Sequence, residues 1–217
     1  AVAHYCEKGS TGLEDPPTIF EGRSLDVKMT PCPSGRFGNA TSRNIDSECS
    51  GECKEGHFCP AASSNATAAP CPAGRYQSGK GGQVREPFGQ LKGCELCPKG
   101  SYCEEGAEES MPCTELNADF TTPSAGAHSA EACVCRIGTF GVIDNSTLLC
   151  VRCDLNSANC TVTGIPRAEL QLLSGYWRSS VNSSVVEECP LASSCVGGRG
   201  MRVCAAGYSG VFCAVCE

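Results

Sequence analysis

The sequence has few of the large apolar side chains from which a protein core is normally built. Only 6% of its 217 residues are aromatic, with a single tryptophan. The most apolar stretch, LQLLSGYW at 170–177, is far shorter than the roughly 20 residues that a membrane-spanning helix needs. We therefore expect no membrane contact from this segment. Hydrophobic burial alone is too small to fold the chain, so cross-links or metal ions must contribute.

The residue patterns of several functional classes are missing as well. A net charge of −7, with Lys and Arg scattered singly, argues against nucleic acid as a partner. The three histidines (His4, His57, His128) stand alone, and the C-x-x-C pairs lack the spacing of a zinc ribbon. No G-x-S-x-G motif or phosphate-binding loop occurs in a suitable context. We expect no enzyme, no catalytic residue, no bound metal and no cofactor.

Cysteine, by contrast, is abundant. Twenty cysteines in one chain are typical of disulfide scaffolds, which form in oxidising compartments. Five N-x-[ST] sequons accompany them, at Asn39, Asn65, Asn145, Asn159 and Asn182. Together they predict a glycoprotein of the secretory pathway, extracellular or at the cell surface. We expect Asn65 to be modified most fully and Asn159 least, because early disulfide formation at Cys160 competes with glycan transfer.

A short motif, C-x-x-G-x-[FY], recurs along the chain. It occurs as CPSGRF at 32, CKEGHF at 53, CPAGRY at 71, CPKGSY at 97 and CRIGTF at 135, with a near relative, CAAGYS, at 204. Its glycine supplies a turn position with positive φ, and its aromatic ring can lie against a disulfide. Arg36 and Arg75 are expected to be solvated. The motif predicts a small disulfide-rich fold, mostly irregular with short β-hairpins, as elongated tandem cysteine-rich repeats.

Two disulfide connectivities fit the spacing, because sequence alone does not fix pairing. In the first, long arcs and short loops each close on themselves: Cys32–Cys49, Cys53–Cys59, Cys71–Cys94, Cys97–Cys103, Cys113–Cys133, Cys135–Cys150, Cys153–Cys160 and Cys189–Cys195. In the second, cysteines interlock as Cys49–Cys59 with Cys53–Cys71, and Cys94–Cys103 with Cys97–Cys113. We favour the first, since one rule also explains residues 135–160.

The chain divides by composition into four parts. Residues 1–31 form an extended segment with one or two strands predicted in 18–30, and we expect it to be the end of a preceding module. Residues 32–160 form the repeat array. Residues 161–188 form a cysteine-free linker, in which 170–177 suits a helix or a strand equally and Trp177 is the expected anchor. Residues 189–217 form a small module of their own. If the short-loop rule also pairs Cys204 with Cys213, only Cys6 and Cys216 lack a partner, and we expect both to belong to neighbouring units of a longer protein.

Residues 32–153 resemble the cysteine-rich repeats called ephrin-type-receptor-like, which are related to those of tumour necrosis factor receptors. The likeness lies in CKEGHFCP, CPAGRY and CELCPKGSYC. CAAGYSGVFC resembles the last hairpin of an epidermal-growth-factor-like domain, which implies a Cys204–Cys213 bond and a partial module of that type. The segment from LQLLSGYW onward is similar to one that follows such repeats in large surface proteins of algae and oomycetes, including flagellar-hair (mastigoneme) filaments.

These resemblances imply a non-enzymatic structural or adhesive segment of a larger extracellular filament or cell-surface assembly. Its partners would be other protein chains or copies of itself, together with glycans. The alternative is the ectodomain stalk of a membrane receptor or channel. An apolar span encoded downstream would favour this alternative.

Non-reducing peptide mapping tests the pairing rule. We expect peptides that link Cys71 to Cys94 and Cys97 to Cys103, because each loop closes on itself. Recovery of Cys94 linked to Cys103 and Cys97 linked to Cys113 would establish the interlocked connectivity instead.

Overall fold

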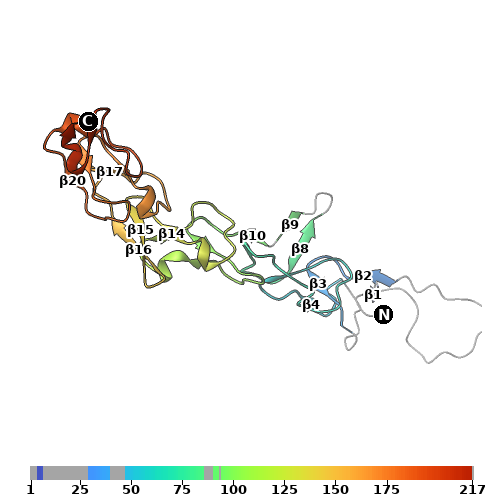
Figure 1. Ribbon diagram of the computed structural model, residues 1–217. Helices are drawn as coiled ribbons and strands as arrows, with labels where there is room; N and C mark the ends of the chain where they lie inside the picture. The colour runs from blue at the N-terminus through green and yellow to red at the C-terminus, as the bar shows by residue number, and fades with distance from the viewer. Residues whose placement is uncertain (1–3, 7–28, 40–46, 86–89, 93, 217) are drawn as a thin grey trace, which may run out of the picture. The chain divides into compact units, whose positions relative to one another are not determined.

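The computed structural model describes residues 4–6, 29–39, 47–85, 90–92 and 94–216 (Figure 1). The chain divides into two compact units. The first comprises residues 1–98, 103–111 and 126–129, and the second comprises residues 99–102, 112–125 and 130–217. Most of the stretch 18–30, where strands were predicted, lies outside the described residues.

Regular structure in the first unit consists of very short strands. They are β1 (His4–Cys6), β2 (Met29–Pro31), β3 (Arg36–Phe37), β4 (Gly51–Glu52), β5 (His57–Cys59), β6 (Ala69–Pro70), β7 (Arg75–Tyr76), β8 (Gly82–Arg85), β9 (Gln90–Lys92) and β10 (Glu95–Leu96). The pairs β1–β2, β3–β4 and β7–β10 are antiparallel two-stranded sheets. The other four strands form one sheet in the order β6-β5-β8-β9, in which β5 and β8 run parallel.

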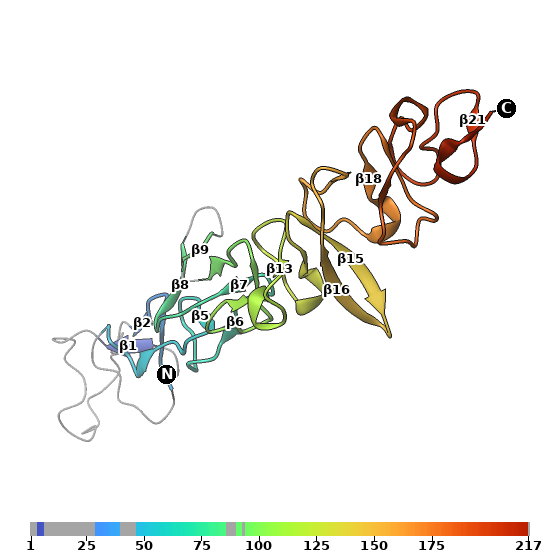
Figure 2. The same ribbon diagram turned by 90° about the vertical axis from the view of Figure 1, so that its left-hand side faces the viewer.

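The second unit has the same character. It contains β11 (Ser101–Tyr102), β13 (Phe120–Thr121), β14 (Val134–Cys135), β15 (Thr139–Asp144), β16 (Thr147–Arg152), β17 (Ala158–Asn159), β18 (Gln171–Leu172), β19 (Tyr176–Trp177), β20 (Glu187–Glu188), β21 (Tyr208–Ser209) and β22 (Val215–Cys216). Strand β12 (Met111–Pro112) lies where the two units meet in sequence. The pairs are β11–β12, β13–β14, β15–β16, β17–β18, β19–β20 and β21–β22, and the β15–β16 hairpin is the longest of them (Figure 2).

Five single 3-10 turns complete the described structure. They are η1 (Cys113–Glu115), η2 (Ala130–Ala132), η3 (Arg167–Glu169), η4 (Ala192–Ser194) and η5 (Val211–Cys213). The described residues contain no α-helix, and none of their helices is long and apolar enough to cross a bilayer. The fold is therefore small, disulfide-rich and mostly irregular, as predicted. The ambiguous stretch 170–177 contains two strands, β18 and β19.

Nine disulfides hold the hairpins together. They are Cys32–Cys49, Cys53–Cys59, Cys71–Cys94, Cys97–Cys103, Cys113–Cys133, Cys135–Cys150, Cys153–Cys160, Cys189–Cys195 and Cys204–Cys213. These are the pairs of the self-closing connectivity, with the closing bond expected for the tail. Cys216 is a free, exposed thiol. Cross-linking on this scale is compatible with an extracellular protein.

Each motif forms a tight turn around its glycine. In CPAGRY, the Arg75 N–H donates to the Pro72 carbonyl at 3.1 Å, and Gly74 has φ of +85°. A positive φ at the third position of a four-residue turn defines type II geometry and favours glycine. The motifs at 32, 53 and 135 close in the same way. The predicted role of the glycine is thus confirmed at these turns.

The turn glycine also joins one hairpin to the next. In the first unit, the Gly74 N–H donates to the carbonyl of Cys103, and the Gly74 carbonyl accepts the N–H of Cys97. In the second unit, Gly138 makes the same two bonds with Cys160 and Cys153. The donor and the acceptor of one residue are therefore both used to bind the short disulfide loop that follows.

One further hairpin in the second unit has this wiring without the motif cysteine. The Gly175 N–H donates to the Cys195 carbonyl at 2.8 Å, and the Gly175 carbonyl accepts the Cys189 N–H at 2.8 Å. Leu172, only 2% exposed, stands where the other motifs have cysteine. Val186 stands three residues before Cys189, as Cys94 stands before Cys97, and it packs against the same apolar cluster as Leu172. Apolar packing here replaces a disulfide.

The motif arginines depart from their predicted solvated state. The Arg36 Nη1 donates to the Glu48 carbonyl at 2.8 Å, and the Arg75 Nη1 donates to the Cys94 carbonyl at 2.9 Å. Both acceptors lie at or next to the cysteine that closes the long arc. Arg36 also forms ion pairs with Glu48 and Glu52. Each arginine thus links the motif at the start of its hairpin to the segment at which the disulfide closes the arc.

Alanine substitution at two equivalent glycines separates backbone strain from crowding. Gly74 and Gly138 occupy the same motif position with φ of +85° and +84°. A Cβ on Gly74 would lie 2.5 Å from the Gly126 carbonyl oxygen, whereas a Cβ on Gly138 would meet nothing within 4 Å. We expect Gly138→Ala to cost about 1–2 kcal/mol from the left-handed backbone alone. Gly74→Ala should cost at least about 2 kcal/mol more.

Pulse proteolysis of each variant in increasing urea gives the free energy of unfolding. Equal costs for the two alanine variants would show that the approach of the Gly126 carbonyl to Gly74 does not matter.

Candidate functional site

A polar pocket of about 210 Å³ opens on the second unit beside the Asn159 sequon. Asn159 comes from β17 and lies opposite Gln171 of β18, so the short sheet supplies one side of the pocket. The following loop supplies Thr161, Ile165 and Pro166. Glu169 and Arg199 add one charge of each sign to the lining. The pocket therefore offers hydrogen-bond donors, acceptors and an apolar surface within one small space.

The sequon itself is held in a fixed conformation. The Asn159 Oδ1 accepts hydrogen bonds from the Thr161 N–H at 3.1 Å and from the Thr161 Oγ1 at 2.8 Å. The Asn65 sequon has the same arrangement, with the Asn65 Oδ1 accepting from the Thr67 N–H at 3.1 Å. Asn65, Asn145 and Asn182 are exposed, while Asn39 and Asn159 are partly buried.

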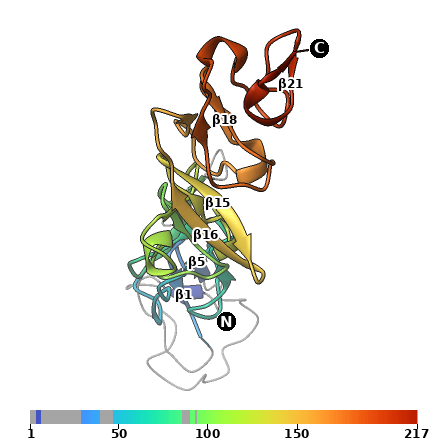
Figure 3. The same ribbon diagram turned by 60° about the vertical axis from the view of Figure 1, so that its left-hand side comes forward.

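A second hollow, an open groove of about 600 Å³, lies over the only tryptophan. Trp177 is 7% exposed and packs against Phe212 with ring centroids 4.8 Å apart. Tyr208 and Met201 also line this groove. Cys216 of β22 pairs with Tyr208 of β21, the strand labelled close to the C-terminus in Figure 3. The free thiol thus belongs to the hairpin at the rim of the groove.

The largest fully buried side chain of the described residues is charged. Arg178 is 1% exposed, and its guanidinium donates to the carbonyls of Arg167 at 2.7 Å and Ala168 at 3.1 Å. Longer bonds reach the carbonyls of Val181 at 3.3 Å and Leu170 at 3.4 Å. Burial, and then the charge of Arg167, lower the pKa of Arg178 from its usual value. The side chain satisfies carbonyl groups around η3, the turn that leads from the pocket to β18.

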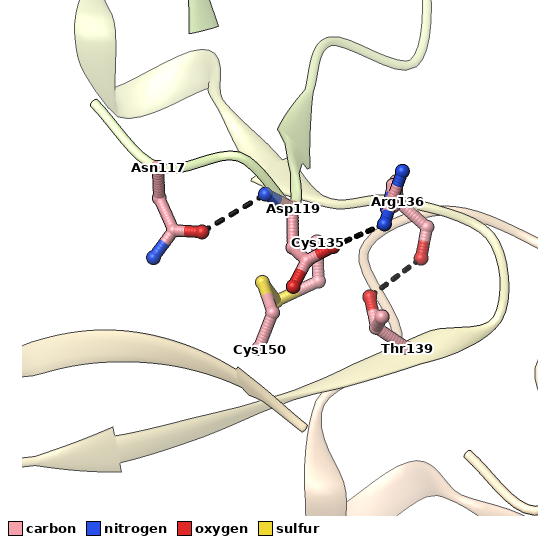
Figure 4. A network of polar contacts seen from close by, with 6 residues as sticks. All are labelled: Asn117, Asp119, Cys135, Arg136, Thr139 and Cys150. Carbon is pink, nitrogen blue, oxygen red and sulfur yellow. Dashed lines mark hydrogen bonds and ion pairs between the residues drawn. A yellow bond between two sulfur atoms is a disulfide. The ribbon is translucent and has the colours of Figure 1, made fainter. Parts of the chain in front are cut away.

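A polar joint fixes the start of the β15–β16 hairpin (Figure 4). The Arg136 side chain forms an ion pair with Asp119, and the Arg136 N–H donates to the Asp119 carbonyl at 2.9 Å. The Asp119 N–H donates to the Asn117 Oδ1 at 2.9 Å, and the Thr139 Oγ1 donates to the Arg136 carbonyl at 2.7 Å. The ion pair is partly exposed, so it contributes at most about 1 kcal/mol. The joint orients the chain beside the Cys135–Cys150 disulfide.

In the first unit, the pKa of one tyrosine side chain is shifted. The Tyr76 hydroxyl donates to the Glu95 carboxylate at 3.3 Å across β7 and β10. Burial, the negative charge of Glu95 and this hydrogen bond raise the pKa of Tyr76 above its usual value. The pair closes the hairpin that Cys71–Cys94 spans.

No group of three or more His, Cys, Asp or Glu side chains in the described ranges is placed to hold a metal ion. Comparison with models of known protein families and with curated protein sequences gave no match.

Sequence reasoning missed both the pocket and Arg178. The pocket depends on the approach of β17, the 161–166 loop and Arg199, which no local pattern encodes. Arg178 follows Trp177 directly and looks like an ordinary surface arginine in sequence. The available signal was LLSGYW at 172–177, which fits the motif once leucine is allowed in place of its cysteine and tryptophan in place of its phenylalanine or tyrosine.

Replacement of Arg178 tests its role. Arg178→Met leaves four carbonyl groups without this donor, and we expect it to lower the free energy of unfolding by about 3 kcal/mol. Arg152→Met, at an exposed position of β16, should change it by less than about 0.5 kcal/mol. Fluorescence of Trp177, which follows unfolding of the second unit, provides the measurement. Similar effects of the two substitutions would show that the buried guanidinium is not a structural support.

Proposed function

We propose that this chain is a non-enzymatic structural or adhesive segment of a larger extracellular filament or cell-surface assembly. The observation that supports it is a recurrent pair of backbone hydrogen bonds: the N–H and C=O groups of Gly35, Gly74, Gly138 and Gly175 each bind the short disulfide loop that follows. Repeats that contact only their neighbours extend by addition of further units, and such arrays serve as scaffolds.

The exposed apolar side chains of the second unit suit contact with other chains. Large apolar side chains are exposed at intervals along the second unit, including Ile137, Ile143, Leu155 and Val211. Scattered apolar residues are ordinary on a protein surface. Here they are exposed on a chain that has few large apolar side chains in total, and they remain available to other chains. Glycans on the five sequons would cover part of the remaining surface and restrict which faces can meet.

The resemblance to ephrin-type-receptor-like repeats with an epidermal-growth-factor-like tail supports the same proposal. Such repeats occur in surface proteins, among them mastigoneme filaments. The partners would then be other chains of the assembly or further copies of this one, outside the cell.

Self-association of the secreted, glycosylated chain tests the proposal. We expect sedimentation velocity to show reversible association as the concentration rises to about 100 µM, since contacts repeated along a filament can be individually weak. A Cys216→Ser variant is the matched control, and its association should persist because it does not depend on a bond through the free thiol.

A chain that stays monomeric throughout this range would contradict a self-assembling role. An apolar membrane span encoded after residue 217 in the same gene would then favour the receptor or channel stalk.

A further inference from the structure

The polar pocket beside Asn159 is built before any ligand arrives. Its 161–166 loop is fixed at two points, because the Gly164 N–H donates to the Cys135 carbonyl at 2.8 Å and the Gly141 N–H donates to the Ile165 carbonyl at 2.7 Å. The opposite side is a paired strand, with Asn159 facing Gln171 in register. Both walls of the pocket are therefore formed without a ligand.

The size of the pocket limits what can occupy it. Drug-sized ligands fill pockets of about 300–1,000 Å³. A volume of about 210 Å³ therefore suits a single small ring and not an extended ligand.

The lining suits a sugar ring. Thr163 and Gln171 can donate to and accept from hydroxyl groups, Arg199 can donate, and Glu169 can accept. Ile165 and Pro166 offer an apolar surface for the face of a pyranose ring or for an acetamido methyl group.

The sequon asparagine is one of the residues that line this pocket. Both hydrogen bonds from Thr161 end on the Asn159 Oδ1, so the side-chain amide is held and its Nδ2 takes no part in those bonds. Nδ2 is the atom to which an N-linked glycan is joined. Asn159 lines the pocket, so a sugar on this atom begins at the pocket wall.

We propose that the pocket holds the first N-acetylhexosamine of a glycan attached to Asn159. The inference rests on the proposed secretory glycoprotein. On attachment, the Nδ2–C1 bond forms as the C1–O bond to the diphosphate of a lipid-linked oligosaccharide breaks, and the amide loses one proton. The seated ring would join β17, the 161–166 loop and Arg199 by contacts that the protein alone does not make.

Glycosidase protection on the folded protein tests this. The chain is expressed in a secretory host that makes uniform high-mannose glycans and treated with endoglycosidase H, which cuts after the first sugar. We expect cleavage at Asn159 to be at least about tenfold slower than at the exposed Asn182, because the enzyme must wait for the ring to leave its pocket. After reduction and denaturation the two sites should be cleaved at equal rates.

Two variants test whether the slow cleavage at Asn159 depends on the pocket. Arg199→Ala removes a lining side chain and should speed cleavage at Asn159 severalfold without affecting Asn182. Arg152→Ala, at an exposed position outside the pocket lining, is the matched control and should leave both rates unchanged.

The outcomes separate this inference from the proposed function. Equal cleavage rates at Asn159 and Asn182 in the folded protein would overturn the seated sugar. A bare Asn159 beside occupied Asn65 and Asn182 would also overturn it, while leaving the secreted glycoprotein intact. If every sequon were bare, the proposed glycoprotein itself would be contradicted.

Discussion

The structure depends on one backbone arrangement, a type II turn whose glycine bonds to the next disulfide loop through both its N–H and its carbonyl. At Gly74 and Gly138 these bonds end on cysteines that are themselves cross-linked. A backbone hydrogen bond contributes only about 1 kcal/mol, whereas closing a 15-residue loop contributes about 3 kcal/mol. The disulfides therefore supply most of the stability, and the glycine bonds set how successive loops are oriented.

The second unit shows what replaces a disulfide when the motif loses its cysteine. Around Gly175 the wiring is retained, but Leu172 and Val186 occupy the cysteine positions and belong to an apolar cluster with Trp177. Arg178, next to the tryptophan, then satisfies the carbonyl groups of the adjoining turn. A conventional core forms where the covalent cross-link is missing.

Much of this fold could be predicted from the sequence. Cysteine spacing favoured the loop closures, because the short x5 and x6 loops recur, and the glycine indicated the turn. The hairpin at Leu172 was missed because its cysteine has been replaced, so a search for the literal motif passes over it. The roles of Arg75 and Arg178 were missed because each depends on carbonyl groups brought close by the tertiary fold. The pocket at Asn159 could not be predicted for the same reason.

The central claim is that each hairpin depends on its own disulfide and on the loop that follows it. Hydrogen exchange after removal of one disulfide tests this account most directly. In a Cys71→Ser, Cys94→Ser variant, the account predicts faster exchange of the Gly74 amide, whose hairpin loses its covalent closure. The amides of Gly138 and Gly175 in the second unit should keep their native exchange rates. Loss of protection at all three glycines, or at none of them, would contradict the account.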